Sequence, residues 1–304
     1  MAATDDQSYR RPTDAADGPG PGRRETLDGR SPVRWQLIDG PPPVHQSVDS
    51  AHQPVDASGS VHHQVVELPG SGHEGANDLT VSEVFGPTFQ GEGPSIGRRA
   101  MFVRLGRCNL DCRWCDTPYT WDWKRFDRDA ELHRRSVPDV VAQLEAIGAT
   151  LLVVTGGEPL LQQHRLVALL EATNARGWRT EIETNGTLAP IPELAALVDQ
   201  WNVSPKLTNS GISCSRRWKP DAVRALARTG RAIGKFVVAH PSELDEVQAM
   251  VDESNLAEVW VMPEGSDAAT VAGRLVCLAP AVLERGWNLS GRLHVQLWGD
   301  ARGA

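Results

Sequence analysis

The sequence lacks long apolar runs, has few cysteines and carries no excess of positive charge. None of its apolar stretches approaches the ~20 residues that a membrane-spanning helix needs. The N-terminus, MAATDDQSYRR, has no apolar core after its charges and is therefore not typical of a secretory signal. The net charge of −8 gives no reason to expect a nucleic-acid-binding surface. We therefore expect a cytoplasmic protein that binds neither membranes nor, directly, nucleic acid.

Residues 1–77 differ in composition from the rest of the chain. They contain nine prolines and nine glycines but no cysteine, no lysine and few large apolar residues. Such a segment cannot bury enough apolar surface to offset the entropy lost on ordering. We expect a disordered Pro/Gly-rich extension over 1–77 and a single folded domain over 78–304.

From residue 79 onward, short apolar segments alternate with helical patterns. Strands are expected at 80–85, 100–105, 150–155, 179–184, 200–204, 234–239, 258–262 and 292–297. Helices are expected at 137–147, 166–176, 191–198, 220–228, 242–253 and 268–285. This alternation is typical of an α/β fold with a mostly parallel sheet. About six strand–helix units are too few for a closed eight-stranded barrel, so we expect a partial, open β/α barrel.

Three of the five cysteines, Cys108, Cys112 and Cys115, lie within eight residues. They follow the expected strand 100–105, and the carboxyl ends of parallel strands are where active-site loops gather. Three thiolates cannot fill the four outer positions of a [4Fe–4S] cluster, so one iron would stay open to an exogenous ligand. A non-catalytic zinc-binding module is the alternative. Zinc favours four protein ligands in paired units, and no second pair is present, which favours the cluster.

The spacing CxxxCxxC on a loop after a strand resembles the radical S-adenosylmethionine (SAM) superfamily. The resemblance implies that the folded domain is catalytic and that SAM binds the open iron, where an electron from the cluster cleaves it. Thr155-Gly156-Gly157-Glu158-Pro159 matches the motif that grips the SAM amino group in that superfamily. The residues implied for SAM binding are Trp114, Asp116, Gly157, Glu158, Glu183, Ser204, Pro205 and Lys206.

A longer resemblance runs from about Thr80 to Ala304. FGPTFQGEG, MFVRLGRCNLDCRWCDT, ETNG, SPK and LHVQLWGDARGA together resemble the 7-carboxy-7-deazaguanine synthases, lyases of queuosine and deazapurine biosynthesis. The implied reaction contracts the ring of 6-carboxy-5,6,7,8-tetrahydropterin with loss of ammonia and depends on Mg²⁺. Thr117 is implied as the Mg²⁺ ligand. The implied substrate contacts are Phe89, Gln90, Gly91, Glu92, Arg104, Thr155 and the terminal carboxylate of Ala304.

The same resemblance implies a homodimer, an electron donor such as flavodoxin or ferredoxin, and no catalytic side chain beyond the cluster and SAM. Two features depart from the family pattern: the N-terminal extension, and Met262 before Pro263, where many relatives have Gln. His294 could face the pocket or serve as a core residue. Within the superfamily, the alternative is a glycyl-radical activating enzyme, which would not need the QGEG segment, Arg104 or Thr117.

Overall fold

The computed structural model describes residues 78–299 and 301–303, so the expected extension over 1–77 and Ala304 lie outside the described residues. Within this part, one nine-stranded sheet has the order β3-β1-β2-β4-β5-β6-β7-β8-β9. β1 (Leu79–Phe89) is antiparallel to β2 (Arg99–Leu105) and to β3 (His133–Arg135). The other strands are β4 (Leu151–Gly156), β5 (Arg179–Thr184), β6 (Gln200–Val203), β7 (Ala232–Val238), β8 (Val259–Pro263) and β9 (Asn288–Leu289).

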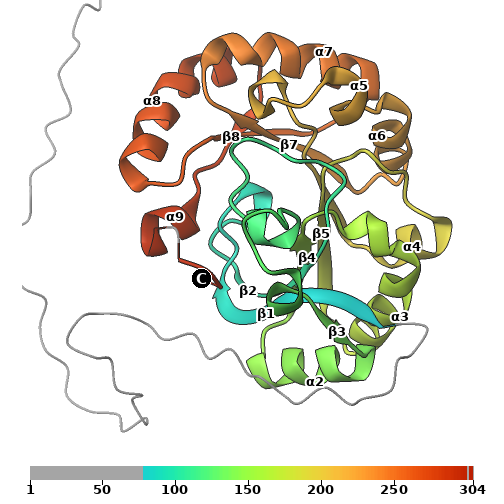
Figure 1. Cartoon of the computed structure of the whole chain (residues 1–304). Helices are drawn as coiled ribbons and strands as arrows, with labels where there is room; N and C mark the ends of the chain where they lie inside the picture. The colour runs from blue at the N-terminus through green and yellow to red at the C-terminus, as the bar shows by residue number, and fades with distance from the viewer. Residues whose placement is uncertain (1–77, 300, 304) are drawn as a thin grey trace, which may run out of the picture. The chain divides into compact units, whose positions relative to one another are not determined.

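From β2 to β9 all neighbouring strands are parallel, and β3 and β9 form the two edges of the sheet. The sheet is therefore curved but open, which confirms the predicted partial β/α barrel (Figure 1). A βαβ connection carries the chain from one parallel strand to the next, so that the carboxyl ends of these strands share one edge.

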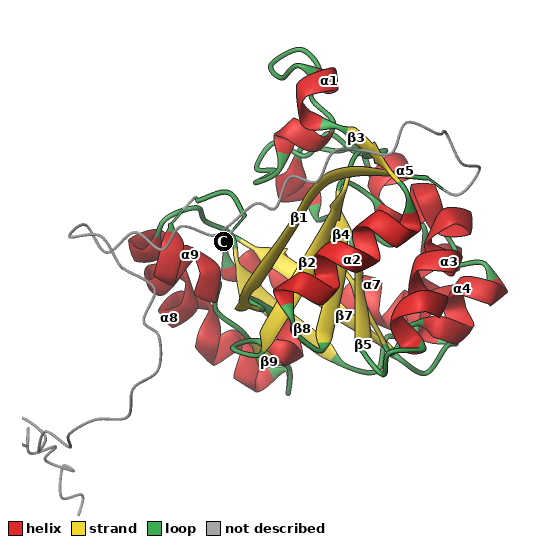
Figure 2. Ribbon diagram, turned by 90° about the horizontal axis from the view of Figure 1, so that it is seen from below, coloured by secondary structure: helices red, strands yellow, loops and turns green. Residues whose placement is uncertain are grey.

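Helices lie around the outside of the strands (Figures 1 and 2). The longer ones are α2 (Val137–Ile147), α3 (Gln163–Asn174), α6 (Pro220–Ala227), α7 (Leu244–Ser254) and α8 (Ala268–Glu284). Short helices are α1 (Arg128–Glu131), α4 (Pro192–Leu197), α5 (Cys214–Arg217) and α9 (Leu293–Trp298). Single 3₁₀ turns span Gly93–Ser95, Pro118–Thr120, Pro159–Gln162, Thr208–Ser210 and Pro241–Glu243. No helix of the described part is long and apolar enough to cross a membrane.

Alternation along β5 and β7 separates an apolar outer face from an inner face that carries charged side chains. In β5, Ile182 packs into the main core beneath the helices, while Glu181 and Glu183 point the other way. The pattern continues in β7, where Phe236 joins that core and Lys235 lies on the inner side. The inner face of the later strands therefore carries buried charge.

The expectation of a strand over 292–297 is wrong. The last strand is β9, and α9 follows it after Gly291. The letters RLHVQL alternate as a strand would, which would put Leu293, Val295 and Leu297 on one face. In the helix these side chains diverge, so that Val295 is buried whereas Leu297 is 46% exposed. The start of α9 is fixed instead by a hydrogen bond from the Leu293 N–H to the Gly91 carbonyl, at 2.9 Å.

Candidate active site

A cavity of about 610 Å³ opens at the carboxyl ends of the parallel strands. It brings together most of the residues predicted from the sequence. Those that line it are Phe89, Gln90, Gly91, Glu92, Arg104, Cys108, Cys112, Trp114, Cys115, Asp116, Thr117, Thr155, Gly157, Glu183, Ser204 and Lys206. Glu158 and Pro205 are not among the lining residues, and Ala304 lies outside the described residues.

The three clustered cysteines sit on the loop that follows β2, each half-buried. Two N–H groups point at their sulfurs: Trp121 Nε1 lies 3.3 Å from Cys115 Sγ, and the Leu110 amide lies 3.4 Å from Cys108 Sγ. Such donors suit a thiolate. Burial raises the pKa of the Cys108 thiol to about 12, so the thiolate form depends on a bound metal.

The arrangement of these thiols fits an iron–sulfur cluster better than a single metal ion. Across 78–299 and 301–303, no three His, Cys, Asp or Glu side chains are grouped as one metal ion would require. A cubane cluster requires a wider spacing of its ligands, because each thiolate binds a different iron. Three cavity-lining thiols, of which Cys108 and Cys115 each have an N–H donor beside the sulfur, meet that requirement.

Gly157 lets the turn after β4 pack directly against the cysteine loop. A Cβ at Gly157 would lie 2.1 Å from the carbonyl oxygen of Arg107 and 3.0 Å from Cβ of Cys108. The Glu158 amide donates to the same Arg107 carbonyl at 2.9 Å. Arg107 itself has φ of 76°, which is uncommon for a residue other than glycine. The two loops thus depend on each other for their shape.

Glu158 is fully buried and faces the protein rather than the cavity. Its carboxylate accepts hydrogen bonds from the Leu160 amide (2.9 Å), the Thr184 hydroxyl (2.8 Å) and the Asn185 amide (2.7 Å). Burial raises the pKa of Glu158, and these three donors oppose the shift. The carboxylate therefore ties the turn after β4 to the end of β5.

One wall of the cavity is formed by residues after β6 and by the cysteine loop. The Lys206 ammonium donates to the Ser204 hydroxyl at 3.0 Å and lies 5.5 Å from the centre of the Trp114 ring. Trp114 is held by a hydrogen bond from its indole N–H to Asn209, at 3.1 Å. A cation and an aromatic face thus lie next to the predicted cluster position.

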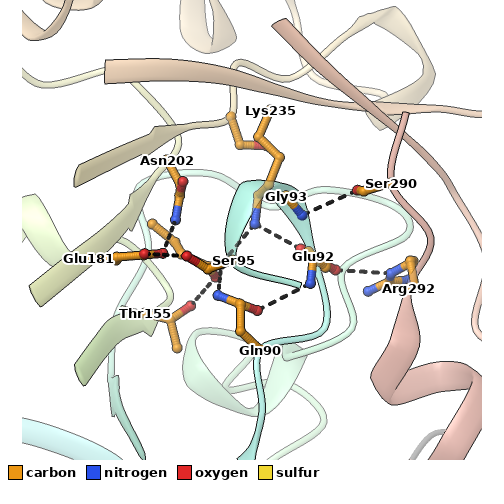
Figure 3. Close-up of polar contacts among 12 residues, drawn as sticks. Gln90, Glu92, Gly93, Ser95, Thr155, Glu181, Asn202, Lys235, Ser290 and Arg292 are labelled. Carbon is orange, nitrogen blue, oxygen red and sulfur yellow. Dashed lines mark hydrogen bonds and ion pairs between the residues drawn. The ribbon is translucent and has the colours of Figure 1, made fainter. Parts of the chain in front are cut away.

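Another part of the cavity lining carries ion pairs between largely buried side chains (Figure 3). Lys235 bridges Glu92 and Glu183, with Nζ 2.8 Å from one carboxylate oxygen of each. Arg292 pairs with the other oxygen of Glu92 at 3.1 Å and with Asp116 at 2.5 Å. Burial alone would raise the pKa of Glu92, but Lys235, Arg292 and His294 together hold it well below its usual range. Both cations and both carboxylates of Glu92 and Asp116 therefore stay charged at neutral pH.

Arg104 lies at the edge of this group, on the inner face of β2. Its Nε lies 3.0 Å from Glu83 Oε2, and its guanidinium lies 5.2 Å from the centre of the Phe85 ring. Glu83 is shared with Arg302, which also pairs with Glu131 at 2.5 Å. The Arg302 guanidinium lies 3.8 Å from the centre of the Tyr119 ring. Arg302 and Gly303 thereby close part of the cavity wall.

Sequence reasoning missed Lys235, Arg292 and Arg302. Lys235 carried a usable signal, because a lysine inside the apolar run GKFVVA is out of place in a buried strand. Arg292 and Arg302 carried none, since exposed and buried arginines look alike in a sequence. His294 lines the cavity, which favours the first of its two expected roles, and burial lowers its pKa.

Comparison with known proteins agrees with this geometry. A model of the Radical SAM superfamily matches residues 103–234. The 7-carboxy-7-deazaguanine synthase of Pyrobaculum aerophilum is 37% identical over 229 residues, which cover 74% of this chain and 97% of that protein. The chain belongs to the 7-carboxy-7-deazaguanine synthase family.

Two further comparisons extend this result. The 7-carboxy-7-deazaguanine synthase of Halobacterium salinarum is 34% identical over 247 residues, which cover 73% of this chain and 91% of that protein. The crystal structure of QueE from Escherichia coli superposes with a TM-score of 0.52 at 26% identity, covering 72% of this chain and 98% of that one. Family membership confirms the predicted enzyme class and its cofactors: a [4Fe–4S] cluster, SAM and Mg²⁺.

Proposed function

We propose that this chain converts 6-carboxy-5,6,7,8-tetrahydropterin into 7-carboxy-7-deazaguanine with loss of ammonia. One observation carries the proposal: a single cavity is lined both by the three cysteines and by Gln90, Glu92 and Arg104. The cluster and SAM, when bound, supply the radical chemistry that removes a hydrogen atom from the substrate. The protein's own residues bind and orient the reactants.

On the substrate side, Arg104 offers a fixed guanidinium for the pterin carboxylate. Glu92 and Glu183 accept hydrogen bonds from the N–H groups of the pterin ring, with Gln90 and Thr155 beside them. Backbone groups of Phe89 and Gly91 and the terminal carboxylate of Ala304 complete this set. Thr117 lines the cavity, with its hydroxyl oxygen 3.7 Å from Cys115 Sγ, and this hydroxyl can ligate a Mg²⁺ ion that also holds substrate.

On the cofactor side, Cys108, Cys112 and Cys115 hold the cluster. The backbone of Gly157 and the wall of Trp114, Ser204 and Lys206 bind SAM, together with Asp116. Glu183 lies where it can reach either ligand. Glu158 and Pro205 act from behind this wall: the contacts of Glu158 are to backbone and hydroxyl groups of the protein.

Nothing in this cavity favours a glycyl-radical activating enzyme. Such an enzyme admits a segment of another protein, whereas this cavity is bounded by buried ion pairs that suit a small charged molecule. We further propose a homodimer in the cytoplasm, reduced by flavodoxin or ferredoxin.

An anaerobic turnover assay tests the proposed function. Purified enzyme with reconstituted cluster, SAM, reductant and the carboxylated tetrahydropterin should form the deazapurine, and Mg²⁺ should raise the rate. The Cys115→Ala variant should lose iron and all product, whereas Cys214→Ala, which changes an exposed thiol, should keep both. An iron-loaded wild type that cleaves SAM but forms no deazapurine would refute the proposal.

A further inference from the structure

Lys235 is a buried cation between two carboxylates that come from distant parts of the chain. Its side chain is 5% exposed, and Nζ lies 2.8 Å from Glu92 Oε2 and 2.8 Å from Glu183 Oε1. Glu92 belongs to the loop after β1, and Glu183 to the end of β5. Figure 3 shows Lys235 reaching toward Glu92. All three side chains line the cavity.

Other donors also bind both carboxylates. Glu183 Oε2 accepts the Thr155 hydroxyl at 2.8 Å, and Glu183 Oε1 also accepts the Gln90 amide at 3.3 Å. Glu92 Oε1 pairs with Arg292 at 3.1 Å. Each carboxylate is thus held from two sides, and Lys235 is the link between them.

Further charged groups surround this trio. His294 lies 3.8 Å from Glu92, and Asp116 pairs with Arg292 from the cysteine loop. Deeper in the barrel, Glu181 is bound to Arg179, Ser95 and Asn202. Burial opposes the charge on Lys235, but Glu183 and Glu92 raise its pKa above the usual value.

We propose that Lys235 is a positioning residue that holds the Glu92 and Glu183 carboxylates side by side as a pair of hydrogen-bond acceptors. The inference rests on the proposed function, because the ligand it serves is the N–H-bearing edge of a pterin. Without the cation, two neighbouring carboxylates would repel, and one of them would take up a proton. A protonated carboxyl presents a donor to the ligand's N–H group and loses that hydrogen bond.

The test compares Lys235→Gln, which removes the charge, with Lys235→Arg, which keeps it. The control is Lys219→Gln, which changes an exposed lysine ahead of α6. Each iron-loaded variant is assayed for KM of the pterin, for kcat and for the pH dependence of kcat/KM. Lys235→Gln should raise KM on the order of ten- to a hundredfold with a smaller change in kcat. The acid limb of its kcat/KM profile should move to higher pH, whereas that of Lys235→Arg should stay at the wild-type position.

Two results would overturn the inference: a Lys235→Gln enzyme with the wild-type KM and pH profile, or a Lys235→Arg enzyme whose acid limb is shifted as far as that of Lys235→Gln. If Lys235→Gln does not fold, the pH dependence of kcat/KM of Lys235→Arg decides alone. An acid limb at the wild-type pH supports the inference, and an acid limb at higher pH refutes it. A wild type that forms no deazapurine would instead refute the proposed function, and the two failures are therefore distinguishable.

Discussion

The guanidinium of Arg292 lies 2.5 Å from the carboxylate of Asp116, although 176 residues separate them in the chain. Asp116 follows the third cysteine, and Arg292 precedes α9. The same guanidinium contacts Glu92 and the carbonyl of Gly265. One side chain therefore joins the cysteine loop, the QGEG loop and the segment after β8.

Replacing Arg292 should destabilise the fold strongly. The variant Arg292→Met removes a cation from the buried Glu92 carboxylate, and breaking a buried ion pair costs about 3–5 kcal/mol, whereas the half-exposed Asp116 carboxylate adds little. Urea unfolding of anaerobically purified protein measures the loss. The control is Arg285→Met, whose partner Asp245 is 84% exposed, and it should cost no more than about 1 kcal/mol. Equal losses in the two variants would contradict the prediction.

Gly157→Ala should damage the cysteine loop. Its new Cβ would lie 2.1 Å from the Arg107 carbonyl, so the loop that carries Cys108 must shift. We expect a lower iron content and a lower melting temperature. Gly273→Ala is the matched control, because α8 leaves open space at this position, and alanine should stabilise the helix by about 1 kcal/mol. Normal iron loading in Gly157→Ala would show that the close packing is not needed.

Thr117→Val should separate magnesium from the rest of the chemistry. Valine keeps the shape of this buried side chain but removes the hydroxyl. We expect the stimulation of turnover by Mg²⁺ to disappear, while iron content and SAM cleavage without substrate stay near wild type. Thr117→Ser should keep the stimulation because it keeps the oxygen. A Thr117→Val enzyme that still responds to Mg²⁺ would place the ion elsewhere.

Glu92 should make the folded state sensitive to acid. Its pKa in the folded protein lies far below the unfolded value of about 4.3, because Lys235 and Arg292 outweigh the effect of burial. The stabilisation is therefore fully present above that unfolded value and is lost as the pH falls below it. Urea unfolding between pH 7 and pH 3 should show a steeper decline for wild type than for Glu92→Gln. If the free energy of unfolding fell equally with pH in both proteins, the prediction would be wrong.

The parts of the site that lie close together in the sequence could be predicted from it. Cys108, Cys112 and Cys115 follow a recognisable strand, and the glycines of the next motif follow another. Because parallel strands bring their carboxyl ends to one edge, these motifs had to meet. The spacing of the motifs and the order of the strands were therefore sufficient to predict that the cysteines and the glycine motif lie in one site.

Contacts made across the fold could not be predicted. Lys235 meets Glu92 over 143 residues, and Arg292 meets it over 200. These two ion pairs form because of the register of the sheet and the path of the chain after β9, and neither can be read from the sequence. The strand expected at 292–297 failed for a related reason, since six alternating letters fit a short helix as well as an edge strand. The sequence likewise did not show that the Glu158 carboxylate points into the protein interior and not into the cavity, because packing determines this orientation.

Arg302 bears on how the enzyme should be produced in the laboratory. Because Arg302 and Gly303 line the cavity and Arg302 is bound to Glu83 and Glu131, a segment fused directly behind them would be tethered to the cavity wall. A purification tag at that end should therefore raise the KM of the pterin, and its proteolytic removal should restore it.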